Sequence, residues 1–315
     1  MRISSIKNNK NKLSLGQTVK KDFTLNKSLY LLMVPGLLFY IIFHYVPMYG
    51  ALIAFKNFSP RLGVAGSEWV GFKHFIYFFT SPSFKDVLIN TLKISFSTMI
   101  FGFPMPIILA LLINELRNAR FAKVVQNATY IPHFISMVII CGMIKDFTRD
   151  TGIISVILSF FGKEPVSMLN YPQYFLPIYV ISGIWQNMGW DSIIYLAALM
   201  GIDDSLYEAA AIDGAGKARQ MWHVTIPGIA PTIITMLILS VGSILSVGYE
   251  KIILLYNDAT LEVADVISTY VYRKGLLEQD WSFSTAVNLF NSVVNLMFLL
   301  GTNYISRKVN DTALW

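Results

Sequence analysis

Charged side chains are scarce in this sequence, and the scarcity argues against an ordinary soluble domain. Asp, Glu, Lys and Arg make up 14% of the 315 residues, whereas soluble domains carry about 25%. Hydrophobic residues reach 54% and gather in long apolar stretches at 29–48, 94–114, 127–144, 176–200, 229–249 and 284–306. Each stretch is near the roughly 20 residues that cross a bilayer as a helix. The sequence therefore predicts an all-α membrane protein with six transmembrane helices, rather than the buried helices of a large soluble protein.

The residue patterns of an enzyme are also lacking. The one cysteine, Cys141, cannot form a disulfide within the chain, and we expect it to be a buried apolar side chain. The segment Gly214–Lys217 lacks the spacing and the Ser/Thr of a phosphate-binding loop, and the four histidines show no metal-ligand spacing. We therefore expect a non-catalytic subunit that binds no metal and no cofactor itself.

Ionisable residues are few within the apolar stretches. Asp191 is the clear exception, while Lys93 and Glu250 lie near the edges of their stretches. Proton- and ion-coupled transporters usually place several such groups at mid-membrane. The scarcity favours transport driven by an external energy source over a secondary transporter, which should also show internal repeats.

Basic residues are concentrated at the N-terminus. Residues 1–28 contain Arg2, Lys7, Lys10, Lys12, Lys20, Lys21 and Lys27. Because Lys and Arg favour the cytoplasmic side, this tail is predicted to be cytoplasmic, and six crossings return the C-terminus to the same side. No basic fold lies beside the tail, so nucleic-acid binding is not expected. The predicted organisation is a basic tail (1–28), one transmembrane domain (29–308) and a short C-terminal tail (309–315).

The segment between the fourth and fifth stretches carries the clearest local signals. Asp203 or Asp204 can cap a helix that continues through Glu208–Ala211. Gly214 and Gly216 permit a sharp chain reversal, at a position that favours positive φ. A second short helix is then expected to end before the next proline. The sequence thus predicts two short helices joined by a glycine bend on the cytoplasmic face.

This segment, residues 201–228, resembles the EAA loop of binding-protein-dependent permeases in ABC importers. The family pattern is E-A-A, three residues, G, nine residues and I-x-L-P. Here it reads Glu208-Ala209-Ala210, Gly214 and Val224-x-Ile226-Pro227. The departures are conservative, with Val for Ile and Ile for Leu. A non-transporting membrane scaffold would leave this loop unexplained.

Further segments resemble the LplB-type branch of the MalF/UgpA-like carbohydrate-uptake family. They are His44–Gly50, Asn90–Leu92, Pro132–Ser136, Tyr195–Leu199 and Ala264–Arg273. This second resemblance implies that the cargo is a carbohydrate, either an oligosaccharide or a polysaccharide fragment. An ABC importer for another solute is the alternative.

The two resemblances imply a type I importer permease in a bacterial cell membrane. The expected partners are a second homologous permease, two cytosolic ATPases that use ATP and Mg, an extracellular substrate-binding lipoprotein and membrane lipid. In the family the EAA loop inserts into a cleft of an ATPase. By this resemblance Glu208 pairs with a basic residue of the ATPase, while Ala209 and Ala210 pack closely against it. Gly214 permits the bend, and Asp213 either fixes it or acts as a local cap.

The substrate path is expected along the helices before and after the loop, as in the resembled sugar transporters. Aromatic faces stack on sugars, and amide and hydroxyl groups hydrogen-bond to them. The candidates are Asn187 and Trp190 before the loop, Ser240 and Ser243 after it, and the stripe Asn288, Asn291 and Asn295 in the last stretch. Because Ser and Asn also join membrane helices to one another, helix–helix bridging remains the alternative.

Overall fold

The structure is a computed structural model that describes residues 23–310 and 313–315 of the chain. Residues 1–22 of the predicted basic tail lie outside the described residues. Within the described part, the helices long and apolar enough to cross a membrane are Lys27–Phe55, Ser83–Asn114, Lys217–Val241 and Trp281–Lys308. The first of them comprises α2 (Lys27–Tyr40), a π turn (Ile41–Tyr45), α3 (Val46–Met48) and a 3-10 turn (Tyr49–Phe55).

The second helix comprises α6 (Ser83–Ser97), a π turn (η3, Thr98–Gly102) and α7 (Pro104–Asn114). The last is α18 (Trp281–Asn310). Three of the four helices contain the apolar stretch that predicted them and extend beyond it, whereas Lys217–Val241 overlaps only part of its stretch.

The fourth predicted span is observed as α11 (Pro172–Leu199), a helix of 28 residues. At 1.5 Å per residue it is long enough to cross a bilayer. Its polar residues, among them Gln186, Asn187 and Asp191, lower its hydropathy. For this reason α11 is not among the helices that are apolar enough to be identified as membrane spans from composition. This central helix packs against α7, against α8 (Ala119–Tyr130) and against α14 (Ile226–Val241).

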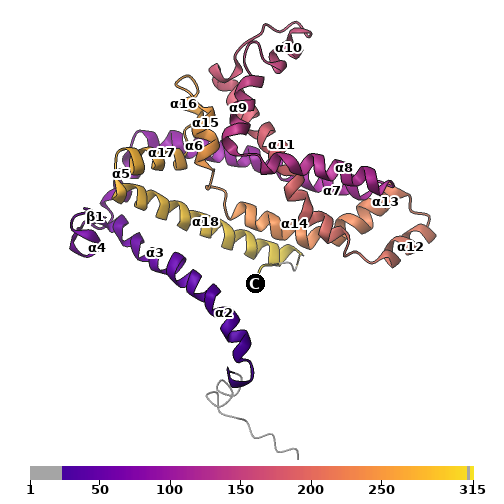
Figure 1. Cartoon of the computed structure of the whole chain (residues 1–315), viewed down its shortest axis with the longest axis horizontal. Coiled ribbons are helices and arrows are strands. Elements are labelled where there is room, and N and C mark those ends of the chain that lie inside the picture. Colours follow the sequence, from indigo (N-terminus) through magenta and orange to yellow (C-terminus); the bar gives the residue numbers. More distant parts are fainter. Residues whose placement is uncertain (1–22, 311–312) are drawn as a thin grey trace, which may run out of the picture.

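The prediction of one straight helix over 127–144 is wrong. The chain instead forms α8 and the 3-10 turn η4 (Ile131–Phe134), bends by 101°, and continues as α9 (Met137–Phe147). Pro132 and the new N-cap at Ser136, whose hydroxyl accepts a hydrogen bond from the backbone N–H of Ile139, explain the break. In Figure 1, α9 leaves the bundle of long helices and carries α10 (Ile153–Ser159) at its tip.

The fifth span is displaced from its predicted position at 229–249. One continuous helix runs through α13 (Lys217–Gln220), the π turn η6 (Met221–Thr225) and α14, so the second loop helix does not end before Pro227 as predicted. In the π turn the N–H of Ile226 donates to Met221 O, and this wider turn lets the helix pass the proline. After Val241 the chain turns and starts α15 (Tyr249–Leu255).

The shorter elements gather at two ends of the long helices (Figure 1). One end carries α12 (Asp204–Ile212) and α13. The opposite end carries α4 (Gly63–Gly66), α5 (Lys73–Thr80) and a two-stranded hairpin, in which β1 (Lys56–Asn57) pairs with β2 (Glu68–Trp69). The remaining elements are η5 (Met168–Asn170), α16 (Leu261–Ala264), α17 (Ile267–Tyr272) and η7 (Arg273–Leu277).

Candidate functional site

The first half of the segment between α11 and α14 has the helix cap and the glycine bend that its sequence predicts. Asp203 caps α12, because its Oδ1 accepts a hydrogen bond of 2.9 Å from the backbone N–H of Ser205. This bond also lowers the pKa of Asp203 below its ordinary value. At the other end of α12, Gly214 has a φ of +76°, and the N–H of Ala215 donates to Ala210 O at 2.9 Å. This left-handed C-terminal cap produces the chain reversal.

The loop is fixed to the transmembrane helices at several points. The hydroxyls of Tyr207 and Thr225 are 3.1 Å apart, which joins α12 to the start of the next long helix. Lys217 forms an ion pair of 3.5 Å with Glu115 at the end of α7. Ile202 packs so closely against Gly228 that a Cβ there would lie 2.8 Å from Ile202 Cδ1. A force on the loop is therefore transmitted to α7, α11 and α14.

The outer surface of the loop is open to a partner. Glu208, Ala209 and Asp213 are exposed, and Ala210 is half-buried. The sequence analysis missed the apolar side chains beside them: Leu206, Ile212 and Trp222 are 52%, 87% and 67% exposed. The sequence could have revealed this surface, because three large apolar residues in so short a loop cannot all be buried. An exposed apolar group around a carboxylate is suited to contact with another protein.

A cavity of about 580 Å³ lies among the long helices. Its walls come from α6 to α7, from the start of α9, from α11, and from the end of α14 through the turn that follows to the start of α15. Three of the predicted substrate-path residues line it: Asn187, Ser240 and Ser243. Asn187 is held in place, because its Nδ2 donates to Gly183 O at 3.1 Å and its Oδ1 lies 3.2 Å from His133 Nδ1. Their role in binding a sugar stays a prediction.

Trp190 shares a helical face with Asn187 but is not part of the cavity wall. Its indole stacks in parallel on the ring of His133, with centroids 4.7 Å apart, and meets Phe134 edge-on at 5.4 Å. The segment Pro132–Ser136, which the sequence singled out, thus packs against α11. The helical spacing could not reveal this, because it depends on how α8 and η4 pack against α11.

The asparagine stripe of α18 also lies outside the cavity wall. Asn295 joins α18 to the turn after α14: it accepts from the N–H of Leu245 at 3.0 Å and donates to Ser246 Oγ at 2.8 Å. For Asn295, these contacts correspond to the alternative role of joining helices rather than lining the substrate path. Asn288 is exposed, and the buried Oδ1 of Asn291 has no hydrogen bond within the part of the chain that the structure describes.

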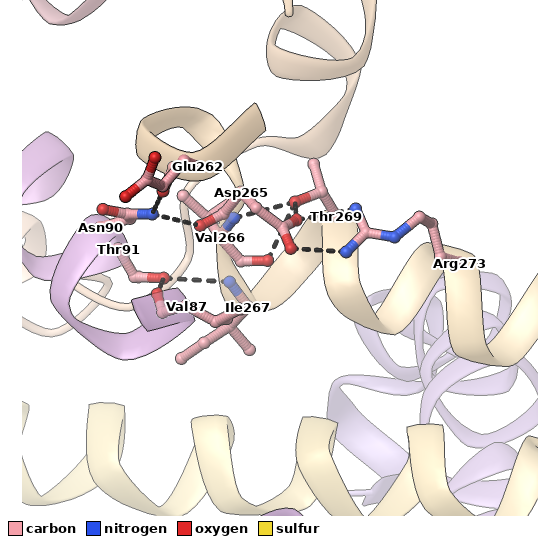
Figure 2. Close-up of polar contacts among 9 residues, drawn as sticks. All are labelled: Val87, Asn90, Thr91, Glu262, Asp265, Val266, Ile267, Thr269 and Arg273. Carbon is pink, nitrogen blue, oxygen red and sulfur yellow. Dashed lines mark hydrogen bonds and ion pairs between the residues drawn. The ribbon is translucent and has the colours of Figure 1, made fainter. Parts of the chain in front are cut away.

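Two segments singled out by the sequence, Asn90–Leu92 and Ala264–Arg273, contact each other (Figure 2). Asn90 Nδ2 donates to the backbone oxygens of Glu262 and Asp265, at 2.7 and 3.1 Å. The fully buried hydroxyl of Thr91 accepts from the N–H of Ile267 at 3.0 Å. These bonds attach α6 to α16 and α17 across more than 170 residues of sequence.

An ion pair completes this contact. Arg273 Nη1 lies 2.8 Å from Asp265 Oδ1, its Nη2 bonds to Oδ2, and Thr269 Oγ1 donates to the same carboxylate at 2.6 Å (Figure 2). The two bonds from Asp265 raise the pKa of Arg273 above its usual value. A bidentate pair with low exposure fixes geometry better than a surface ion pair does.

We expect Asp265→Ala to destabilise the protein by roughly 1–3 kcal/mol, because Arg273 and Thr269 lose a half-buried acceptor. The matched control is Glu278→Ala, which removes an exposed ion pair with Lys274 and should cost about 0–0.5 kcal/mol. Thermal unfolding of the purified protein in detergent measures both. Equal midpoints for the two variants would contradict the structural role of the Asp265 pair.

Comparison with known proteins places the chain among transport components. Residues 102–311 match the family model described as "Binding-protein-dependent transport system inner membrane component". Protein LplB of Bacillus subtilis (strain 168) is 46% identical over 291 residues, which cover 92% of each chain. The polygalacturonan/rhamnogalacturonan transport system permease protein YteP of the same organism is 45% identical, over 92% of this chain and 90% of the relative.

The fold has a counterpart among solved structures. A chain of a bacterial ABC transporter involved in the import of the acidic polysaccharide alginate superposes on this one with a TM-score of 0.84. The two are 43% identical, and the match covers 93% of this chain and 99% of that chain. The similarity therefore extends over nearly the whole length of both chains.

Proposed function

The chain belongs to the family of inner membrane components of binding-protein-dependent transport systems, and on this premise we propose that it carries an oligosaccharide or polysaccharide fragment across a bacterial cell membrane. The observation that carries the proposal is the exposed loop α12–α13, which is fixed to the helices that line a cavity. The similarity to YteP, a polygalacturonan/rhamnogalacturonan transport permease, and to the alginate importer supports a carbohydrate cargo.

The loop couples an external motion to the cavity. It connects α11 to α14, and both helices contribute to the cavity wall. When a cytosolic ATPase moves the loop, these two helices move with it, and the cavity changes its access from one side to the other. In this mechanism Glu208 pairs with a basic residue of the ATPase, and the ATPase binds ATP and Mg.

The remaining partners complete a membrane assembly. Helix α2 buries none of its residues within this chain, and Leu31 and Leu32 are 72% and 77% exposed, which supports contact with lipid or with a second permease. The second permease faces the cavity from the other side, so the path runs between two homologous chains. An extracellular binding protein delivers the cargo to this path.

Copurification and uptake test the proposal together. Wild-type protein should bring down an ATPase and a second permease, and reconstituted complexes should take up oligosaccharide with ATP turnover that the loaded binding protein stimulates. Glu208→Lys should reach the membrane at normal levels, yet bind the ATPase at least about 10-fold more weakly, because a like charge replaces one member of an ion pair. Glu164→Lys, which reverses the charge of an exposed residue outside the loop, serves as the charge control and should bind the ATPase as wild type does.

Several results would overturn the proposal. Uptake by Glu208→Lys at the wild-type rate would remove the coupling role of the loop. ATP hydrolysis by the isolated chain would contradict its place as a non-catalytic subunit. Uptake of a non-carbohydrate solute in preference to every oligosaccharide tested would leave the transport function in place but exclude the proposed cargo.

A further inference from the structure

A lysine that the sequence analysis did not single out reaches into the wall of the cavity. Lys251 lies in α15, and its side chain is almost completely buried, with the residue 7% exposed. It belongs to the cavity wall together with Gln186 and Asn187. Hydropathy alone could not identify it, because it lies just beyond an apolar stretch, and its burial results from the packing of α15 against α9 and α17 and from its contact with Tyr179 of α11.

The surroundings of the ammonium leave part of its hydrogen-bonding capacity unused. Its Nζ donates to Tyr179 O at 3.0 Å and lies 4.7 Å from the centroid of the Tyr179 ring. The absence of a side chain at Gly183 makes room for the ammonium, since a Cβ at Gly183 would lie 3.4 Å from Lys251 Nζ. An ammonium has three donors, and the structure describes one acceptor for this one. Within the described residues, no ion pair involves Lys251.

Burial of a cation without a carboxylate partner costs free energy. A buried lysine of this kind is therefore best explained by a role in binding an anionic group of a ligand. Two acidic residues also line the cavity. Glu250 is exposed, and Asp191 lies 12 residues further along α11 than Tyr179, which is about 18 Å along the helix. Glu250 is the residue before Lys251, but within the described residues it forms no ion pair with it. Asp191 lies further along the wall, where it can accept from sugar hydroxyls.

We propose that Lys251 binds the carboxylate of a uronic acid unit in the transported oligosaccharide. The inference rests on the proposed function and narrows its cargo to acidic oligosaccharides. An ammonium held by one carbonyl at the cavity wall can turn its remaining N–H bonds to a carboxylate. Gln186, whose Oε1 is buried without a hydrogen bond within the described part of the chain, adds a second polar side chain to the same cavity wall.

The similarity to transporters of acidic polysaccharides supports this assignment. The alginate importer is named for an acidic polysaccharide, and polygalacturonan, in the name of YteP, is a chain of uronic acids. Such a cargo brings one carboxylate per uronic acid unit into the cavity. A cavity without a cation would have to strip water from these groups without any compensating charge.

Direct binding tests the proposal. The purified transporter, assembled with its ATPase and second permease but without binding protein, is titrated with trigalacturonate and with the same trisaccharide after reduction of its carboxyl groups. We expect wild type to bind the acidic form at least about 10-fold more tightly, a factor that corresponds to 1.4 kcal/mol. Lys251→Met should lose this preference while binding the reduced trisaccharide as wild type does, and Lys251→Arg should keep most of it.

Two further variants keep the test decisive. Lys85→Met removes an exposed lysine outside the cavity wall and should leave the preference unchanged. Lys251→Gln is a second neutral variant in case the methionine variant assembles poorly. The proposal is overturned if wild type shows no preference for, or no binding of, the acidic form, or if the neutral Lys251 variants keep the preference. If the Lys251 proposal fails but neutral oligosaccharides are still taken up, the proposed transport function is unaffected. If no carbohydrate is taken up at all, the transport function itself is contradicted.

Discussion

Gly214→Val is expected to abolish uptake while leaving the protein inserted in the membrane. The backbone at Gly214 has a φ of +76°, a conformation that costs a β-branched residue on the order of 1–3 kcal/mol or more. No atom lies within 4 Å of the position that a Cβ would occupy, so the substitution strains the turn without disturbing the packing. The turn should relax into another conformation and move Glu208 away from its partner. Uptake by reconstituted complexes, set against the amount of protein in the membrane, measures the effect.

The control lies two residues away in the same turn. Gly216 has an ordinary backbone conformation, with a φ of −70°, and open space around it. Gly216→Ala should therefore transport at nearly the wild-type rate. Equal uptake by Gly214→Val and Gly216→Ala would show that the left-handed turn is not needed for coupling.

Gly189→Leu is expected to prevent stable folding. A Cβ at Gly189 would lie 2.0 Å from Thr129 O and 2.4 Å from Thr129 C, both backbone atoms of α8. Close approach of two helix backbones at a small residue is a common way to pack membrane helices. Overpacking at such a contact typically costs about 1–3 kcal/mol and more where backbone must move. Even Gly189→Ala should lower the thermal midpoint in detergent and reduce the yield of folded protein.

Gly142→Ala is the matched control for this prediction. Gly142 is also a helical glycine, in α9, but nothing lies within 4 Å of its Cβ position. It should be neutral or slightly stabilising, because alanine favours the helix. A Gly189→Leu protein that unfolds at the wild-type temperature would show that α8 and α11 do not approach as closely as the structure has them.

The membrane helices, the helix cap and the glycine turn could be predicted from the sequence, because each depends on residues that are close together in the chain. Long apolar runs identify membrane helices, because the backbone must satisfy its own hydrogen bonds in lipid. The cap at Asp203 and the left-handed turn at Gly214 were also predictable, since both depend on side chains within one helical turn. Two short helices, α12 and α13, do lie on either side of this turn, but the second one continues past Pro227 as part of a long helix.

Contacts between distant segments were decided only by the tertiary structure. Packing of α8 and η4 onto α11 places His133 on Trp190, and Trp190 lies outside the cavity wall to which Asn187 belongs. Packing of α15 against α9 and α17, together with the contact of Lys251 with Tyr179 of α11, buries Lys251. Hydropathy and capping report the local environment of a residue. Which residues meet across 70 or more positions depends on how bent helices pack against one another, and no local pattern encodes that geometry.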